Sequence, residues 1–153
     1  HGRYEMGLKN GMNGLPSTEA VSLGIHESQS RFWENNIGRS REFIELIFPI
    51  IKEQFPNQMA SVNPDLIFKE VNYIEPSLIR TESDELTYHY HIMIRYEIEK
   101  QLISGDLKVV DVADAWNAMY KKYLKVNVPN DGMGVLQDVH WSFAGIGYFP
   151  TYS

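Results

Sequence analysis

Cysteine is absent from the sequence, so neither a disulfide framework nor thiolate catalysis is available to this chain. Basic residues are in the minority: 14 lysines and arginines stand against 20 aspartates and glutamates, and the net charge is −6. Binding to nucleic-acid phosphates requires a basic surface, so nucleic acid is excluded as the main partner. A length of 153 residues suits one domain or one piece of a larger one.

Long hydrophobic runs are also missing. The longest covers residues 43–51, carries Glu45 and Pro49, and is far shorter than the roughly 20 apolar residues that span a bilayer. We therefore expect no membrane association, and with no visible signal peptide an intracellular setting is compatible. The chain opens with His1 and stops in an aromatic-rich stretch, so we expect residues 1–153 to be a single segment of a larger domain, truncated at both ends.

Hydrophobic periodicity predicts a mainly α-helical fold with at most a short strand or hairpin. Helices are expected over residues 16–36, 40–54, 65–72, 84–103 and 110–124. Pro49 should kink or split the second of them, and Leu78 with Ile79 would suit a short strand. The two long helices have apolar stripes that we expect to face inward: Leu86, Tyr90, Met93, Ile94, Ile98 and Leu102 on one, and Val112, Trp116, Met119, Tyr120 and Tyr123 on the other.

A polar run interrupts the first helix at residues 26–31, HESQSR. Glu27 and Arg31 are four residues apart in the order that favours an ion pair, so a surface salt bridge is one interpretation. A carboxylate placed for a metal ion is the other. His26 lies about 100° around the helix from Glu27, so these two side chains do not easily bind one ion.

His1 adds a second candidate ligand. Zinc sites of the HExxH class use two histidines one helical turn apart and a third ligand from another helix. The Gly- and Asn-rich loop between His1 and Glu27 allows two antiparallel helices, which would bring the imidazole and the carboxylate together. A histidine left by a purification tag is the alternative for His1.

Four blocks together resemble one family. GIHESQSR at residues 24–31 is similar to its HESxxR motif, and IRTESD at residues 79–84 is similar to IRxxAD, with Ser83 in place of the usual alanine. GVLQDVHW at residues 134–141 resembles GxxQDxHW, and YFPTY at residues 148–152 resembles the segment that follows it. The family is the thermostable carboxypeptidase 1 family of zinc metallocarboxypeptidases, which belong to the HExxH class. The blocks cover nearly the whole chain in the family's order.

The resemblance implies a helical, neurolysin-like catalytic region that begins at the second histidine of HExxH. His1 and Glu27 would be two of three ligands to zinc, or to cobalt or another divalent metal in its place. The remaining histidine and the glutamate that acts as general base would lie before His1, so this segment alone is expected to be inactive. The substrates would be peptides with a free C-terminus, and the full-length protein would be a cytoplasmic homodimer.

The other motif residues receive roles by the same resemblance. Arg80 would bind the substrate's C-terminal carboxylate through its guanidinium fork. His140, with Tyr148 or Tyr152, would donate to the oxyanion or the substrate backbone. The remaining four residues would support these: Gln137 and Asp138 would brace the substrate-binding wall, Arg31 would fix Glu27 or a neighbouring acid, and His26 would be a supporting residue.

Each role has a structural alternative. Arg80 can pair with Glu82 or Asp84, His140 can be a buried histidine beside Trp141, and the tyrosines can be core aromatics. His89 and His91 point apart on a helix, and we interpret them as structural. Two functional alternatives also stay open: an HExxH endo-oligopeptidase, and a non-enzymatic helical interaction module.

Overall fold

The computed structural model describes residues 2–8, 11–12 and 14–152, and within these ranges the chain is helical with no strand. Six α-helices follow one another: α1 (Gly2–Gly7), α2 (Leu23–Arg31), α3 (Arg41–Gln54), α4 (Pro64–Val71), α5 (Glu85–Ser104) and α6 (Val112–Tyr123). Short 3-10 turns lie between and after them: η1 (Pro16–Thr18), η3 (Arg80–Glu82), η4 (Val109–Asp111), η5 (Asp131–Met133), η6 (His140–Phe143) and η7 (Phe149–Tyr152). The predicted mainly α-helical fold is confirmed.

The first long helix differs from its prediction at both ends. Of the predicted residues 16–22, only Pro16–Thr18 is helical, and α2 begins after Ser22, whose hydroxyl accepts a hydrogen bond from the backbone N–H of Ile25. At the other end α2 continues as a π-helix, η2 (Phe32–Gly38), in which the N–H of Arg39 donates to the carbonyl of Glu34. The wider turn changes the direction of the side chains that follow Arg31.

Two other local predictions are corrected. Pro49 lies inside one unbroken α3 and does not split it. Residues 73–79 hold no strand: Ile79 is extended, but it leads directly into the 3-10 turn η3. Serine, asparagine and aspartate caps account for the starts of the later helices, with Ser40, Asn63 and Asp84 each accepting from a backbone N–H of the first turn.

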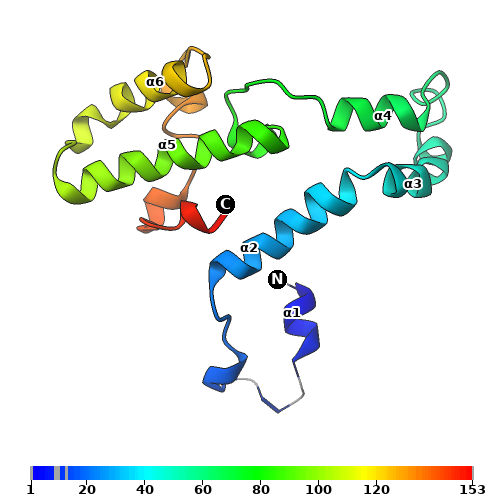
Figure 1. Ribbon diagram of the computed structural model, residues 1–153, viewed down its shortest axis with the longest axis horizontal. Helices are drawn as coiled ribbons and strands as arrows, with labels where there is room; N and C mark the ends of the chain where they lie inside the picture. Colours follow the sequence, from blue (N-terminus) through cyan, green and yellow to red (C-terminus); the bar gives the residue numbers. More distant parts are fainter. Residues whose placement is uncertain (1, 9–10, 13, 153) are drawn as a thin grey trace.

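The main core lies between α5 and α6, which run side by side as a hairpin (Figure 1). Its buried members are Ile94, Ile98, Val112, Trp116, Tyr120 and Leu124. The C-terminal segment folds beneath α5, and η7 contacts both α5 and α2 (Figure 1). Phe149 of η7 packs with Tyr88 and Ile92 of α5 in a second, smaller cluster. The C-terminal turn η7 thus packs against both α2 and α5.

The inward stripe of α5 is only partly the predicted one. Ile94 and Ile98 are buried, but Leu86 is 58% exposed and Tyr90 is 42% exposed. His91 and Arg95 are buried in their place. Polar side chains occupy these positions because each forms hydrogen bonds within the core, as described below.

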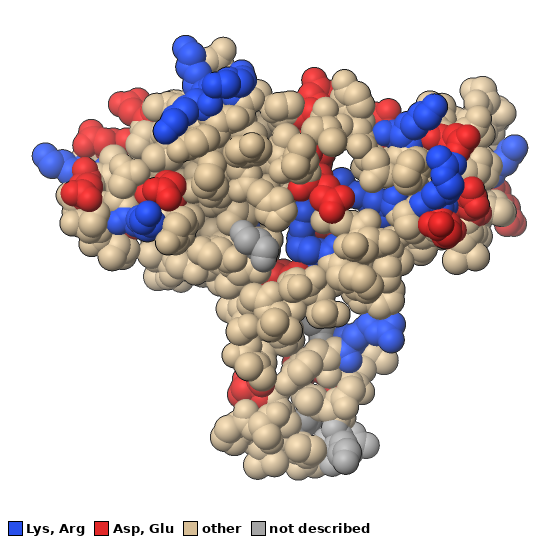
Figure 2. Space-filling view, in the orientation of Figure 1, with Lys and Arg blue, Asp and Glu red and all other residues tan. Residues whose placement is uncertain are grey.

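No helix in the part of the chain that the structure describes combines the length and hydropathy needed to cross a bilayer. On the face shown in Figure 2, acidic and basic side chains are interspersed over the two ends of the molecule. No extended basic face is seen there, which agrees with the net charge of −6.

Candidate functional site

Arg80 is held by the QD pair of the GxxQDxHW motif. Its Nε and Nη2 atoms donate to the Asp138 Oδ1 atom at 3.0 and 2.7 Å, and its Nη1 atom donates to the Tyr88 hydroxyl at 2.9 Å. Its backbone N–H donates to the Gln137 Oε1 atom at 2.9 Å. The structural alternative, in which Arg80 pairs with Glu82 or Asp84, is therefore wrong. Gln137 and Asp138 thus hold Arg80 in place, and their predicted position in a substrate-binding wall remains a prediction.

A second buried arginine completes this cluster. The Nε and Nη2 atoms of Arg95 lie 2.6 and 2.5 Å from the Asp138 Oδ2 atom, and Nη2 also donates to Gln137 Oε1 at 2.9 Å. Burial alone would raise the pKa of Asp138, but the charges and hydrogen bonds of Arg95 and Arg80 outweigh it and lower that pKa below its ordinary value. Asp138 is consequently ionised at neutral pH.

Glu27 and the C-terminal aromatic residues lie next to the group formed by Arg80, Arg95, Gln137 and Asp138. Only 8% of the Glu27 surface is exposed, and the Tyr148 hydroxyl donates to the Glu27 Oε1 atom at 3.4 Å. The His140 ring lies among aromatic rings, 5.3 Å from that of Tyr148 and 5.8 Å from that of Tyr152. The packing of η7 against α2 thus brings together motif residues that are more than a hundred positions apart in sequence.

His140 and Tyr152 share a hydrogen bond, with 3.0 Å between Nε2 and the hydroxyl oxygen. Burial lowers the pKa of His140, so the imidazole is neutral near neutral pH. Burial raises the pKa of Tyr152, and the nearby Tyr148 and Glu27 add to the shift, so the phenol keeps its proton. The pair therefore offers a neutral imidazole and a protonated hydroxyl as hydrogen-bonding groups.

Arg80 lies against this aromatic group as well. Its guanidinium carbon is 5.0 Å from the centre of the Tyr152 ring and 5.6 Å from that of Phe149. His140 Nδ1 is 3.9 Å from Asp138 Oδ1, and no hydrogen-bond partner satisfies this buried nitrogen. One continuous site thus contains Arg80, His140, Tyr152 and, through Tyr148, Glu27.

Two predicted supporting residues lie further out. Arg31 does not pair with Glu27; it pairs with the neighbouring Glu34 at 3.0 Å, and its guanidinium carbon lies 3.9 Å from the centre of the Tyr88 ring. His26 is half-buried and has an edge contact with the ring of Tyr4, with 4.8 Å between centroids. Tyr88 therefore lies between Arg31, which contacts its ring, and Arg80, which donates to its hydroxyl.

The described residues do not test the metal-ligand prediction. His1 lies outside them, and they include no group of three His, Asp or Glu side chains close enough to hold a metal ion. Glu27 supplies a nearly buried carboxylate, a donor that fits a divalent cation such as zinc. The roles of Glu27 and His1 as ligands remain predictions.

Tyr88 and Arg95 were not identified from the sequence. Both belong to α5, and both bind the motif residues directly: Tyr88 bonds to Arg80, and Arg95 bonds to Gln137 and Asp138. A signal for Arg95 exists in retrospect. It lies four residues after His91 and three before Ile98, on the helix face that is buried, and a buried arginine requires an anionic partner.

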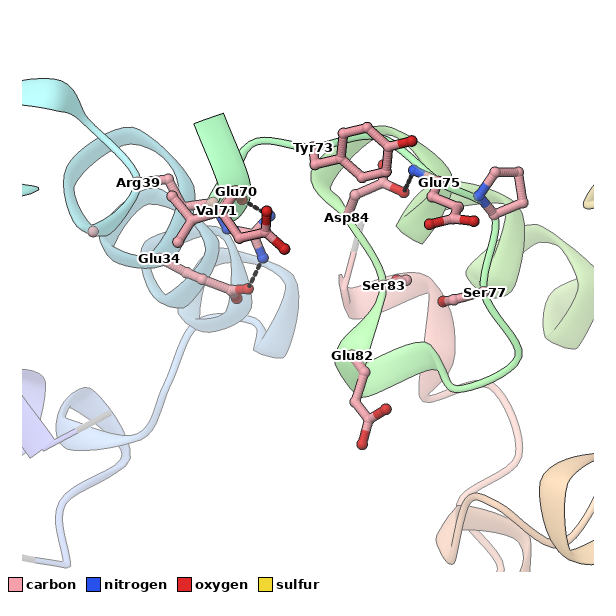
Figure 3. Close-up of a pocket in the computed structure, with 12 residues that line it drawn as sticks. Glu34, Arg39, Glu70, Val71, Tyr73, Glu75, Ser77, Glu82, Ser83 and Asp84 are labelled. Atoms are coloured by element: carbon pink, nitrogen blue, oxygen red, sulfur yellow. Dashed lines mark hydrogen bonds and ion pairs between the residues drawn. The ribbon is translucent and has the colours of Figure 1, made fainter. Parts of the chain in front are cut away.

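A cleft of about 820 Å³ opens beside this site, between the η2–α4 region and the segment that leads into α5 (Figure 3). Arg39 pairs with Glu34 on one wall, and the Asp84 carboxylate accepts from the backbone N–H of Glu75 on the other. The charged residues lining the cleft are Glu34, Arg39, Glu70, Glu75, Glu82 and Asp84. This mostly acidic lining makes the cleft unfavourable for anions.

The helical architecture and the motif residues gathered beside Glu27 place the chain in the class of helical metallopeptidases. Within that class, it belongs to the carboxypeptidase Taq (M32) metallopeptidase family, whose sequence profile matches residues 1–153. This confirms the resemblance seen in the motifs.

Named relatives support the assignment. The chain is 46% identical to thermostable carboxypeptidase 1 of Thermus thermophilus and 43% identical to that of Pyrococcus furiosus, in each case over all 153 residues. It also superimposes on the crystal structure of an M32 carboxypeptidase from Deinococcus radiodurans with a TM-score of 0.88 and 46% identity, covering 97% of this chain and 30% of that one. The chain spans 30% of the length of the two curated relatives.

Proposed function

We propose that the full-length protein is a zinc-dependent metallocarboxypeptidase that removes single residues from the C-termini of peptides. The observation that carries this proposal is the state of Arg80. A guanidinium has five N–H donors, of which Asp138 and Tyr88 together use three. One N–H donor is left on each terminal nitrogen, and such donors form charge-assisted hydrogen bonds with a carboxylate. An exopeptidase needs such a group to recognise a free C-terminus.

The residues around Arg80 suit the rest of the reaction. With the substrate carboxylate on Arg80, the scissile bond would lie towards His140 and the two tyrosines, since Tyr152 contacts both Arg80 and His140. A protonated phenol and a neutral imidazole N–H can donate to the oxygen that becomes negatively charged during attack by water. Tyr148, which donates to Glu27, would hold that carboxylate in place.

Zinc is the metal that we infer for the site, and Glu27 and His1 would hold it together with a histidine that the HExxH resemblance places before His1. Bound there, zinc would lower the pKa of a water molecule to about 7 and polarise the scissile carbonyl. We further infer a cytoplasmic homodimer, which rests on the family resemblance alone.

The proposal is tested by comparing a peptide that has a free C-terminal carboxylate with its C-terminal amide, using the full-length protein. Wild-type enzyme should cleave the free acid and leave the amide nearly intact. Arg80→Ala should lower kcat/KM for the free acid by about 10- to 100-fold, the effect of losing a charge-assisted hydrogen bond, and should abolish the preference for acid over amide.

Arg41→Ala is the matched control, because Arg41 also has a carboxylate partner, Asp65, but is exposed on α3. That variant should keep wild-type kinetics on both peptides. Equal cleavage of acid and amide by wild-type enzyme would indicate an endo-oligopeptidase instead. An equal loss on both peptides in Arg80→Ala would remove Arg80 from carboxylate recognition.

A further inference from the structure

Arg95 is the most deeply buried charged side chain near the site, with 0% of its surface exposed. Its guanidinium makes four hydrogen bonds: Nε donates to Asp138, Nη1 donates to the His91 carbonyl at 2.8 Å and to the Tyr120 hydroxyl at 3.4 Å, and Nη2 donates to Gln137. Nη2 also forms an ion pair with Asp138. The Trp116 ring covers its guanidinium, with 4.5 Å from the guanidinium carbon to the ring centre. Because its side chain is fully buried and held by these contacts, Arg95 is not available to a substrate.

Arg80 binds the same Asp138 carboxylate, but some of its N–H donors are unused. It uses only Oδ1 of Asp138, while Arg95 uses Oδ2. The two guanidiniums therefore lie on opposite oxygens of one carboxylate, and the free donors of Arg80 lie away from Arg95. Gln137 links the two again, because its Oε1 atom accepts from the Arg80 backbone and from Arg95 Nη2.

The charges of the three side chains explain why two arginines are needed. A buried Arg80–Asp138 pair alone would be neutral and would attract a carboxylate only weakly. With Arg95 as a second cation, the cluster keeps one net positive charge, in surroundings where charges are poorly screened. Arg95 thus supplies a positive charge that offsets the negative charge of Asp138 beside Arg80.

We propose that Arg95 is a positioning residue for substrate recognition: by sharing Asp138 with Arg80, it keeps the cluster cationic and holds the two free donors of Arg80 ready for a peptide's C-terminal carboxylate. This inference rests on the proposed function. It makes the recognising unit an Arg–Asp–Arg cluster in place of a single arginine.

The test uses the full-length enzyme with the free-acid and amide peptides. Arg95→Met removes the charge with a side chain of similar length and should raise KM for the free acid about 10-fold or more, with kcat changed less than about 3-fold. Asp138→Asn leaves two cations but weakens the support of Arg80, so it serves as the reference for the double variant. The double variant Arg95→Met/Asp138→Asn has one net positive charge again, so its KM for the free acid should fall from that of Arg95→Met towards the wild-type value.

Restoration confined to the KM for the free acid is the readout that a purely structural role would not give, because relief of an unpaired buried charge would change the cleavage of both peptides alike. Unchanged KM in Arg95→Met, or a double variant no better than Arg95→Met alone, would overturn the proposal. Circular dichroism and metal content establish that each variant is folded and loaded.

If Arg95→Met does not fold, the comparison moves to Asp138→Asn and the double variant. The double variant lacks the Arg95 charge that Asp138→Asn keeps, so its KM for the free acid should be higher by about 3-fold or more. Equal KM values in these two enzymes would overturn the proposal. Failure of the proposed function would look different, since wild-type enzyme itself would then cleave acid and amide equally.

Discussion

At the scale of single residues, Glu27 stands out because a carboxylate is seldom as buried as this one, of whose surface 8% is exposed. It lies on α2 and accepts a hydrogen bond from the Tyr148 hydroxyl of the C-terminal segment. The proposed role of Glu27 as a metal ligand makes a claim about metal content that does not depend on activity.

We expect the full-length protein to bind about one zinc ion per chain and Glu27→Gln to lose most of it on dialysis, measured by elemental analysis. Loss of a residue that only supports a ligand lowers metal affinity about 10- to 100-fold. Glu27→Gln should lower zinc affinity by more than this, because it removes a direct ligand. Glu34→Gln is the matched control: this acid lies two turns further along, is half-exposed, and should leave metal content unchanged. Wild-type zinc content in Glu27→Gln would exclude Glu27 as a ligand.

Residue by residue, the motifs indicated which side chains come together better than periodicity predicted the core. Arg80, Gln137, Asp138, His140 and the tyrosines are recognisable in sequence because they belong to short blocks, and the structure brings those blocks together. Arg95 belongs to no such block. Its role depends on a contact with a residue 43 positions away, and a single sequence contains no information on that pairing.

At the scale of elements, helix existence was predictable and helix limits were not. The predicted helix over 84–103 is close to the observed α5 at Glu85–Ser104, where Asp84 caps the start and Gly105, at φ 82°, ends it. The helix predicted from residue 16 begins at Leu23 instead, because Ser22 provides a competing cap. The π-turn after Arg31 had no sequence signal that distinguishes it from ordinary helix.

The α5–α6 hairpin contains a polar contact with a pH-dependent consequence. His91 Nδ1 lies 2.9 Å from the Tyr120 hydroxyl, and burial, helped by the charges of Arg95 and Arg80 against Asp138 and Asp84, lowers the pKa of His91 from 6.5 to about 3. Between these values the unfolded chain binds a proton that the folded chain does not. Stability contributed by neutral His91 is therefore present above the unfolded pKa and decreases as the pH falls below it.

We expect the free energy of unfolding of the full-length protein, measured by urea denaturation, to decrease between about pH 7 and about pH 5, with His91 contributing about 2 kcal/mol of that loss. His91→Gln should be less stable near neutral pH but should lose that much less on acidification. His89→Gln is the control, since His89 is exposed on the same helix and should leave the pH dependence unaltered. The same acid-induced loss in His91→Gln as in wild type would contradict this account.

At the scale of the whole molecule, the surface is too large for a compact monomer. The accessible area is 10405 Å², whereas a compact chain of 17.7 kDa exposes roughly 7,900 Å². The extra area includes large apolar side chains on several elements: Val21, Leu46, Ile50, Val109 and Val110 are all exposed. The prediction that residues 1–153 are one segment of a larger helical domain explains these faces as surfaces that the domain would cover.

That explanation predicts how the segment behaves when separated from the domain. Residues 1–153 expressed alone should bind a hydrophobic dye such as ANS and unfold over a broad range of denaturant, because α3 and α4 contribute little to the core between α5 and α6. The full-length protein should bind far less dye per chain and unfold more steeply. If the isolated segment unfolded in one sharp transition without binding dye, the exposed apolar faces would belong to a self-sufficient fold, and the larger domain would not be needed to stabilise it.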